Sequence, residues 1–469
     1  MNRWWALGAV ALATFMTYLD NNVVNVALPT IQRDLHLTIS GLEWIVSAYI
    51  LVFAGLLLVG GRLADLFGRR AVFFTGLAIF TIASVVAGLS GSQDMLIAAR
   101  AVQGVGAALL TPATLPLLLD LFPNPRERAT AVGVWGAVGA LALALGPLLG
   151  GLLSENVAWG WIFLINAPIG VITAVLALLS LRKPSQAATR ARLDLPGLVT
   201  SSGALFALTF ALIEGERRGW TSAAILSSFA AAAVAFAMFL VIESRTRQPM
   251  IDLSLFRERF FTGGLAVMGL WAFGVFGIYF FTAIYLQNAL GFSPIEAGAG
   301  FVPMALIMAV LAGVSPRIAE RFGTGRTISA GMILMAIAIA GLSQAGAGSD
   351  YFDVLPWFLL YGAGGGSLVP LTNIILGAMP PARSGVASGV LNASREVFGL
   401  LGVTVLGAIL GARQVAPTMP AFLDAYQFTL IIAAVVVLAG VPISLYALRE
   451  RRRPAEAAAE VPETELVAG

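Results

Sequence analysis

The sequence contains no cysteine, which excludes disulfide bonds, iron–sulfur clusters and thiolate metal sites. It contains one histidine, His36, and a single imidazole cannot build a zinc site alone. Its one lysine, Lys183, follows Arg182, so the chain has no phosphate-binding loop of the G-x-x-x-x-G-K-[ST] type. We therefore expect no metal ion, no bound cofactor and no ATPase of this type.

Charged residues are also scarce. Soluble globular proteins contain about 25% charged residues. Here they make up 11% of 469 residues, while hydrophobic residues make up 58%. A shortfall of this size is typical of a chain that lies mostly in lipid. The formal net charge of +3 would suggest a nucleic-acid partner only if the arginines gathered on a soluble surface.

Long apolar segments recur along the whole chain. A transmembrane helix needs about 20 mostly apolar residues. By this measure the sequence predicts fourteen spans, at residues 4–28, 43–62, 72–92, 95–120, 127–153, 158–181, 194–214, 221–243, 260–287, 295–317, 326–346, 351–377, 383–412 and 424–448. The first apolar run is too long for a cleavable signal peptide and continues into patterned sequence.

The basic residues fall almost entirely on one side of these spans. Short loops rich in Lys and Arg stay in the cytoplasm. With the N-terminus inside, all the basic residues fall in cytoplasmic segments except six. These are Arg33, Arg217, Arg218 and Arg413 in outer loops, and Arg100 and Arg395 within spans. We therefore expect both termini in the cytoplasm and no nucleic-acid partner.

Segments of the first half return in the second half at a nearly constant offset. GRLADLFGRR, from Gly61, has a weaker copy in PRIAERFGTG, from Pro316. This predicts an all-α polytopic protein with two six-helix halves of the same orientation, at residues 1–182 and 258–450. Residues 183–257 hold two inserted helices, and residues 451–469 form a disordered cytoplasmic tail. Parallel repeats around a central site are a transporter design.

Five motifs follow each other along the chain. They are LDNNVVNVALP in the first span, GGRLADLFGRR before the third, RAVQGVGAA in the fourth, GAVGALALALGPLLGG in the fifth and WGWIFLINAPIG in the sixth. Together they resemble the 14-helix drug:proton antiporter branch (QacA/EmrB-like) of the major facilitator superfamily, from about Leu19 to Arg449. The departures are Asn22, where threonine is usual, and Gly160, where arginine is usual. The resemblance implies proton-coupled export by alternating access.

Asp20 is a carboxylate inside the first span. An ionised Asp at bilayer depth costs about 2.5–3.5 kcal/mol on insertion scales, so it must face water, find a partner or stay protonated. A cationic substrate favours the charged form, so one site could hold a proton and a substrate in turn. Alternatively, Asp20 only hydrogen-bonds neighbours such as Asn21. The resemblance implies proton or substrate coupling, and we include Asn25 among the substrate contacts.

Arg100 lies about one turn into the fourth span. Its side chain either reaches outward to the headgroups or points into the bundle, where its charge would help a nearby carboxyl group to lose its proton. Gln103 can supply a hydrogen bond there. The resemblance implies a role in proton coupling for Arg100.

Arg395 and Glu396 are neighbours in the thirteenth span. Adjacent helical residues point about 100° apart, so we do not expect these two to pair with each other. We predict that Glu396 is a second carboxylate of the cavity and that both residues take part in proton coupling. The alternative is a buried ion pair between Glu396 and an arginine of another helix.

The fifth span is rich in small residues, at Gly136, Gly139, Gly146 and Gly150, with Pro147 among them. Small residues allow close helix contact in membranes, and proline permits a bend. The resemblance implies a proton-tight seam between the halves, although simple bundle packing would use the same residues.

A short cytoplasmic link joins the second and third spans and carries Asp65 and Arg69. Asp65 could cap a neighbouring helix, where the macrodipole favours an anion. Arg69 could pair with Asp120, at the cytoplasmic end of the fourth span. We predict a conformational latch that stabilises the outward-facing state and opens on protonation, although the arginines could also serve topology alone.

Two carboxylates have local explanations. Ser40 to Glu43 and Ser293 to Glu296 both show the S-x-x-E spacing of a capping box, in which the glutamate satisfies a backbone amide at a helix start. We therefore expect Glu43 and Glu296 to be capping residues.

The ninth span is dense in aromatic residues, of which Trp271, Tyr279 and Tyr285 are our candidates for substrate contacts. Aromatic rings can line a lipophilic cavity and offer cation–π contacts. The alternative is that most of the aromatic residues of this span face lipid or serve packing.

The combined reading is a multi-pass transporter of the cell membrane that exchanges protons for lipophilic, cationic or aromatic compounds. A dedicated exporter of one antibiotic, metabolite or lipid is an alternative. A membrane enzyme or receptor is a further one, disfavoured by short loops that hold no nucleophile–base pair. The expected partners are a small amphipathic substrate and the bilayer, with a periplasmic adaptor where the cell has two membranes.

Overall fold

The computed structural model describes residues 3–122, 124–181, 194–246, 249, 251–368, 371, 384–414, 416 and 418–448, and leaves aside the side chains of Asp65 and of some residues in α5 and at the start of α16. The elements are α1 (Arg3–Leu35), α2 (Ile39–Phe67), α3 (Arg69–Gly88), α4 (Gln93–Leu121), α5 (Pro125–Asn156), α6 (Trp161–Leu164), α7 (Asn166–Ser180), α8 (Leu195–Arg218), α9 (Ala223–Arg245), η1 (Leu253–Arg257), α10 (Arg259–Asn288), α11 (Pro294–Gly300), α12 (Val302–Phe322), α13 (Thr324–Leu342), α14 (Tyr351–Gly366), α16 (Ser384–Arg413), α17 (Met419–Leu438) and α18 (Gly440–Ala447).

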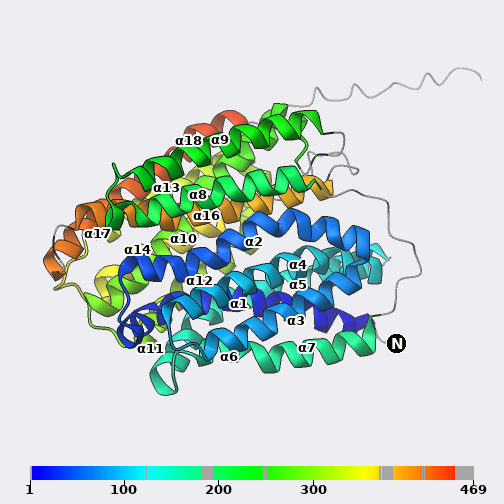
Figure 1. Ribbon diagram of the computed structural model, residues 1–469, viewed down its shortest axis with the longest axis horizontal. Helices are drawn as coiled ribbons and strands as arrows, with labels where there is room; N and C mark the ends of the chain where they lie inside the picture. The colour runs from blue at the N-terminus through cyan, green and yellow to red at the C-terminus, as the bar shows by residue number, and fades with distance from the viewer. Residues whose placement is uncertain are drawn as a thin grey trace, which may run out of the picture.

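The helices run roughly side by side along one direction, as a membrane bundle requires (Figure 1). Within the described ranges, eleven helical segments are long and apolar enough to cross a membrane. α1 and α5 are not among them, although they have 33 and 32 residues. α14 ends at Gly366, close to residues outside the described ranges. The predicted all-α membrane fold is confirmed, whereas the count of fourteen spans stays a prediction.

The two predicted capping boxes differ in outcome. Ser293 caps α11, and Glu296 Oε2 accepts a hydrogen bond from the Ser293 amide at 2.8 Å, which confirms that box. At α2 the prediction is wrong, because the cap is Thr38, whose side chain accepts from the Gly41 amide. Glu43 is instead buried inside the bundle, with 3% of its surface exposed.

The helices α8 and α9 form a hairpin between the two groups of helices that precede and follow it. α8 packs against both α2 and α16, and Figure 1 shows α9 at the upper edge of the bundle. The hairpin therefore touches both predicted halves, although the division of the chain at the predicted boundaries stays a prediction.

We call the end of the bundle where α1 ends and α2 begins the outer end, because the positive-inside rule directs it outside. Contacts between the two groups of helices close this end. Gln287 of α10 donates to the Val26 carbonyl of α1 at 2.6 Å. Glu155 of α5 accepts from the Ile295 amide of α11 at 2.9 Å.

Glycines of α5 bring neighbouring backbones into direct contact at the same end. A Cβ atom at Gly150 would lie 2.5 Å from the Val23 carbonyl oxygen of α1, and one at Gly151 would lie 2.2 Å from the Pro294 carbonyl oxygen of α11. Nearer the start of α5, no atom lies within 4 Å of the position that a Cβ atom would take at Gly136. Close packing is therefore concentrated at the outer half of the helix.

Three other residues of the predicted α5 seam also lie in contact. A Cβ atom at Gly146 would meet the Asn22 side chain at 2.6 Å, while Gly139 makes only ordinary contacts with α1. Pro147 lies inside α5, and its carbonyl oxygen would be 2.2 Å from a Cβ atom at Gly298 of α11. α5 thus contacts α1 on one side and α11 on the other.

Candidate functional site

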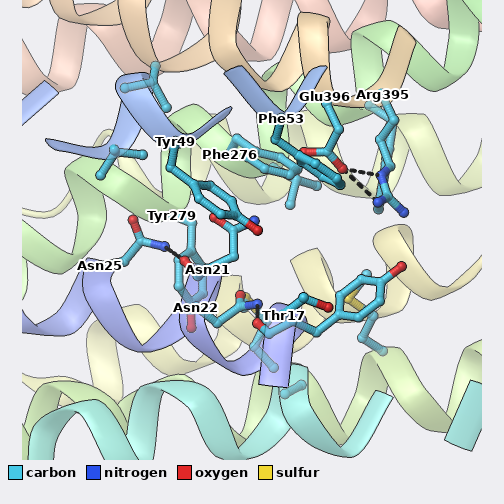
Figure 2. A pocket seen from close by; sticks show the side chains of 18 of the residues that line it. Thr17, Asn21, Asn22, Asn25, Tyr49, Phe53, Phe276, Tyr279, Arg395 and Glu396 are labelled. Carbon is cyan, nitrogen blue, oxygen red and sulfur yellow. Dashed lines mark hydrogen bonds and ion pairs between the residues drawn. The ribbon is translucent and has the colours of Figure 1, made fainter. Parts of the chain in front are cut away.

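A central cavity lies between α1, α2, α4, α10, α12, α14 and α16, so both groups of helices contribute to its wall. The space among its lining side chains is about 1190 Å³, including solvent at its mouth. Its wall combines aromatic rings with the amides of α1, and Figure 2 shows Asn21, Asn22 and Asn25 together with Phe276 and Tyr279 among the lining side chains. This mixture of apolar and polar groups suits an amphipathic molecule.

Arg395 and Glu396 form an ion pair on the cavity wall (Figure 2). Arg395 Nη2 lies 2.6 Å and Nε 3.1 Å from Glu396 Oε1. The prediction that these neighbours do not pair is wrong, because the long arginine side chain folds back across the 100° between them. Among the described lining residues they are the only charged ones, so the described wall carries no net charge.

Four polar atoms of the wall have no hydrogen-bond partner within the described part of the chain. They are the indole Nε1 of Trp271, the hydroxyls of Thr111 and Tyr361, and Oε2 of Glu396. All four residues line the cavity. Buried polar groups are nearly always hydrogen-bonded, so the indole and the two hydroxyls offer donors, and the carboxylate oxygen offers an acceptor, to water or to a bound molecule.

Asp20 lies outside the cavity, in a network with no exposed atoms. Arg100 Nη1 pairs with Asp20 Oδ2 at 2.5 Å, and both side chains are 0% exposed. The amides of Gln103 and Asn166 donate to Asp20 Oδ1 at 3.1 and 2.8 Å. The carboxylate is therefore held by α4 and α7 rather than by its neighbours on α1.

Tyr49 of α2 lies between this network and the cavity. Its ring lines the cavity and lies 4.4 Å from the Arg100 guanidinium carbon. Arg100 also donates from Nε to the Ile45 carbonyl at 3.3 Å, one turn before Tyr49. The Tyr49 ring thus separates the Asp20–Arg100 pair from the cavity. Direct contact between Asp20 and a substrate has no support in this structure.

The remaining predicted substrate contacts divide into two groups. Asn25, Trp271 and Tyr279 line the cavity. Tyr285 does not: it stacks on Tyr426, with ring centres 4.8 Å apart, and donates to the Gly346 carbonyl at 2.9 Å. Helical spacing explains the difference, because six residues from Tyr279 to Tyr285 rotate the side chain far from the cavity face.

The predicted Arg69–Asp120 pair is present, with Nη1 and Oδ2 2.6 Å apart. It joins α3 to α4 within one group of helices, and both side chains are substantially exposed, at 36% and 60%. An exposed pair contributes little stability. Asp65 lies in the last turn of α2, but its side chain is outside the described set. The role of the three residues as a latch therefore stays a prediction.

The sequence analysis missed three residues of this region. Tyr49, Asn166 and Ser84 are fully or almost fully buried, and Gln103 donates to Ser84 Oγ at 2.7 Å. Asn166 carried a signal, because a lone amide inside an apolar span needs a partner. Tyr49 and Ser84 carried none, since a tyrosine and a serine among apolar residues are common in membrane helices.

The sequence model of the Major Facilitator Superfamily matches residues 10–403. The chain belongs to the major facilitator superfamily. Two solved major facilitator structures share its fold: a bacterial homolog of the human lysosomal transporter Spinster, facing inward and unoccupied, and an autoinhibited peptide transporter of the POT family. Their TM-scores are 0.68 and 0.70, their identities 17% and 16%, and they cover 95% and 97% of this chain and 97% and 98% of their own.

Curated major facilitator relatives are more similar in sequence. The tetracenomycin C resistance and export protein of Streptomyces glaucescens is 38% identical, over 87% of this chain and 76% of its own. The multidrug resistance protein Stp of Mycobacterium tuberculosis is 35% identical, over 90% and 78%. The cephamycin export protein CmcT of Amycolatopsis lactamdurans is 36% identical, over 87% and 85%. Membership of the superfamily makes the chain a multi-pass membrane transporter rather than an enzyme.

Proposed function

We propose that the protein exports lipophilic, aromatic or cationic drug-like compounds in exchange for protons, by alternating access. The observation that carries this proposal is the position of Tyr49, between the central cavity and the buried Asp20–Arg100 pair. The names of the relatives, which refer to resistance and export, support the direction and class of the cargo.

The geometry supports coupling through the cavity wall rather than competition at one atom. While Asp20 is ionised, it holds Arg100 by an ion pair and accepts two amide hydrogen bonds. A proton on Asp20 neutralises the carboxylate and weakens that pair. Because the Arg100 guanidinium lies on the Tyr49 ring, its release changes the support of the wall that a cargo molecule touches. Conversely, cargo that displaces Tyr49 changes the surroundings of Arg100 and thereby affects the Asp20–Arg100 pair.

The cavity wall suits cargo with an aromatic body and a few hydrogen-bonding groups. Trp271, Phe276 and Tyr279 provide flat apolar surface, and the unpaired Glu396 Oε2 offers one acceptor for an ammonium or hydroxyl group. Because Arg395 balances Glu396, neutral cargo needs no counter-charge. The protein therefore accepts cationic compounds without requiring them.

A dedicated exporter of one antibiotic is a second candidate. Two of the relatives are named for a single compound each, tetracenomycin C and cephamycin, whereas Stp is named for multidrug resistance. Growth protection against a panel of dyes and antibiotics separates the two readings. Protection against several unrelated compounds supports the multidrug exporter, and protection against one class supports the dedicated one.

Proton coupling is tested in proteoliposomes that carry a pH gradient and ethidium. We expect the wild-type protein to accumulate ethidium against its gradient, and Asp20→Asn to lose this uphill transport while it keeps downhill exchange. Asp34→Asn is the matched control, because Asp34 is exposed on the same helix. Full uphill transport by a folded Asp20→Asn variant would refute the coupling role.

A further inference from the structure

We propose that Glu43 is a second proton-binding residue, and that its protonation holds the outer end of the cavity closed. It lies in a contact that we call the acidic seam, formed by Glu43 of α2, Glu216 of α8, and Gly407 and Gly411 of α16. This inference adds to the proposed function. It rests on that function in one respect, because it assumes that cargo leaves through the outer end.

The seam places two carboxyl groups directly on the backbone of α16. A Cβ atom at Gly407 would lie 2.0 Å from Glu43 Oε1, and one at Gly411 would lie 1.8 Å from Glu216 Oε2. These glycines are one helical turn apart, so the two carboxyl groups share one face of α16. Any larger residue at either position would displace the acid.

Glu43 is buried inside the bundle. It is 3% exposed, and no described residue forms a hydrogen bond or an ion pair with it. The other carboxyl group of the seam belongs to Glu216, whose charge has the same sign. An ionisable side chain buried in a membrane bundle is costly, so Glu43 is a candidate for a functional residue.

The nearby cations are engaged elsewhere. On α8, Arg217 and Arg218 both bind Glu214, which also accepts from the Trp44 indole at 3.2 Å. On α16, Arg413 pairs with Asp424 of α17 at 2.8 Å.

From α4, Arg100 approaches the opposite face of α2, where it binds the Ile45 carbonyl and Asp20. Two residues along a helix turn the side chain by about 200°, so Ile45 and Glu43 face opposite ways. Within the described part of the chain, Glu43 therefore has no cation to balance an ionised carboxylate.

The closed seam consequently requires a neutral Glu43. An unpaired buried charge costs several kcal/mol, and a carboxyl group avoids that cost by keeping its proton. When α2 and α16 separate, water enters and the carboxyl group can ionise beside Glu216. Because the closed state binds the additional proton, low pH favours closure of the seam and higher pH favours its opening.

The seam lies between the cavity and the outer end, on the same face of α16 that lines the cavity. Glu396 and Val403 line the cavity, and Gly407 lies on the same side of α16, eleven residues or about 16 Å beyond Glu396. Opening between Glu43 and Gly407 would therefore connect the cavity with the outer surface. The inserted helix α8 takes part because it supplies Glu216, which makes ionisation of Glu43 costlier.

The native chain has no cysteine, so one engineered thiol can report opening without background. Val403→Cys places it on the cavity wall. In vesicles with the outer side exposed, its reaction with a membrane-impermeant maleimide is measured at pH 6 and pH 8. Rates are divided by those of Asn156→Cys, exposed at the same end, to remove the pH dependence of the thiol itself.

We expect the normalised rate of Val403→Cys to rise about fivefold or more from pH 6 to pH 8, as one-proton linkage allows. Glu43→Gln, which imitates the protonated form, should remove this rise and keep the rate low at both values. Glu296→Gln is the matched control, because Glu296 lies at the same end and is engaged in a capping box. It should leave the rise unchanged.

The same rise in Glu43→Gln as in the parent would overturn the proposal. If Glu43→Gln fails to fold, Gly407→Ala decides instead: its methyl group displaces the carboxyl group, and labelling should increase at both pH values. Unchanged labelling there would also count against the seam. Loss of ethidium transport with an intact pH response would refute the proposed function but not this inference.

Discussion

Asp20 and Arg100 form a buried ion pair in which each residue without the other is costly. Both are 0% exposed, and together they satisfy each other's charge, with Gln103 and Asn166 completing the hydrogen bonds of the carboxylate. Removing one partner of a buried ion pair leaves an uncompensated charge, whereas removing both can be nearly neutral. This asymmetry makes the contribution of the pair measurable.

Arg100→Gln should therefore destabilise the protein by about 3–5 kcal/mol, the range found when one partner of a buried pair is removed. The double variant Asp20→Asn with Arg100→Gln should recover most of that loss. Thermal unfolding in detergent measures both. Equal loss in the single and double variants would show that Arg100 is not compensated by Asp20.

Tyr49 should act as a barrier between cavity water and Asp20. Tyr49→Phe keeps the ring that covers Arg100 and should leave proton retention unchanged. Tyr49→Ala removes the ring, so water can reach the pair, and proton leak without cargo should increase several-fold. A pH-sensitive dye inside proteoliposomes measures the leak, and equal leak in the two variants would contradict the barrier role.

At the scale of elements, α5 shows how glycine position determines what a helix can do. At Gly151 the backbone of α11 lies where a side chain would be, whereas Gly136 of the same helix has free space around it. Small residues at a helix interface allow backbones to approach closely. The outer half of α5 is therefore committed to contact with α11.

Gly151→Val should weaken closure of the outer end, at a cost of about 1–3 kcal/mol typical of overpacking. Gly136→Val is the matched control and should have little effect. Maleimide labelling of Val403→Cys from the outer side reports closure in both backgrounds. More labelling with Gly136→Val than with Gly151→Val would contradict the assignment.

At the scale of the whole molecule, the described contacts close the outer end of the bundle between its two groups of helices. Gln287 with Val26, and Glu155 with Ile295, connect α10 and α11 to α1 and α5. Alternating access requires these contacts to separate in each cycle. A covalent bond between the two groups at this end should therefore stop transport.

Glu155→Cys with Ile295→Cys tests this requirement, because the native chain adds no other thiol. We expect a short reducible crosslinker to abolish uphill ethidium transport, and reduction to restore it. Each single cysteine variant, treated in the same way, should keep full transport. Transport that continues in fully crosslinked protein would mean that the outer end does not open during the cycle.

The two S-x-x-E segments show how much of a helix start a short sequence pattern can predict. Ser293 to Glu296 forms its capping box, because Ser293 stands directly before the first residue of α11 and Glu296 is exposed there. Ser40 to Glu43 has the same spacing, but α2 begins one residue before Ser40, and packing against α8 and α16 takes Glu43 into the bundle. A four-residue pattern contains no information about those helices.

The sequence by itself determined the membrane class, the helical architecture and the identity of the costly intramembrane charges, because lipid demands long apolar helices and penalises every ion it encloses. Only the tertiary structure decided which groups meet. It paired Arg395 with Glu396, separated Asp20 from the cavity by Tyr49, and turned Tyr285 away. These outcomes depend on helix rotation and on contacts between residues far apart in the chain, which hydropathy and short motifs do not encode.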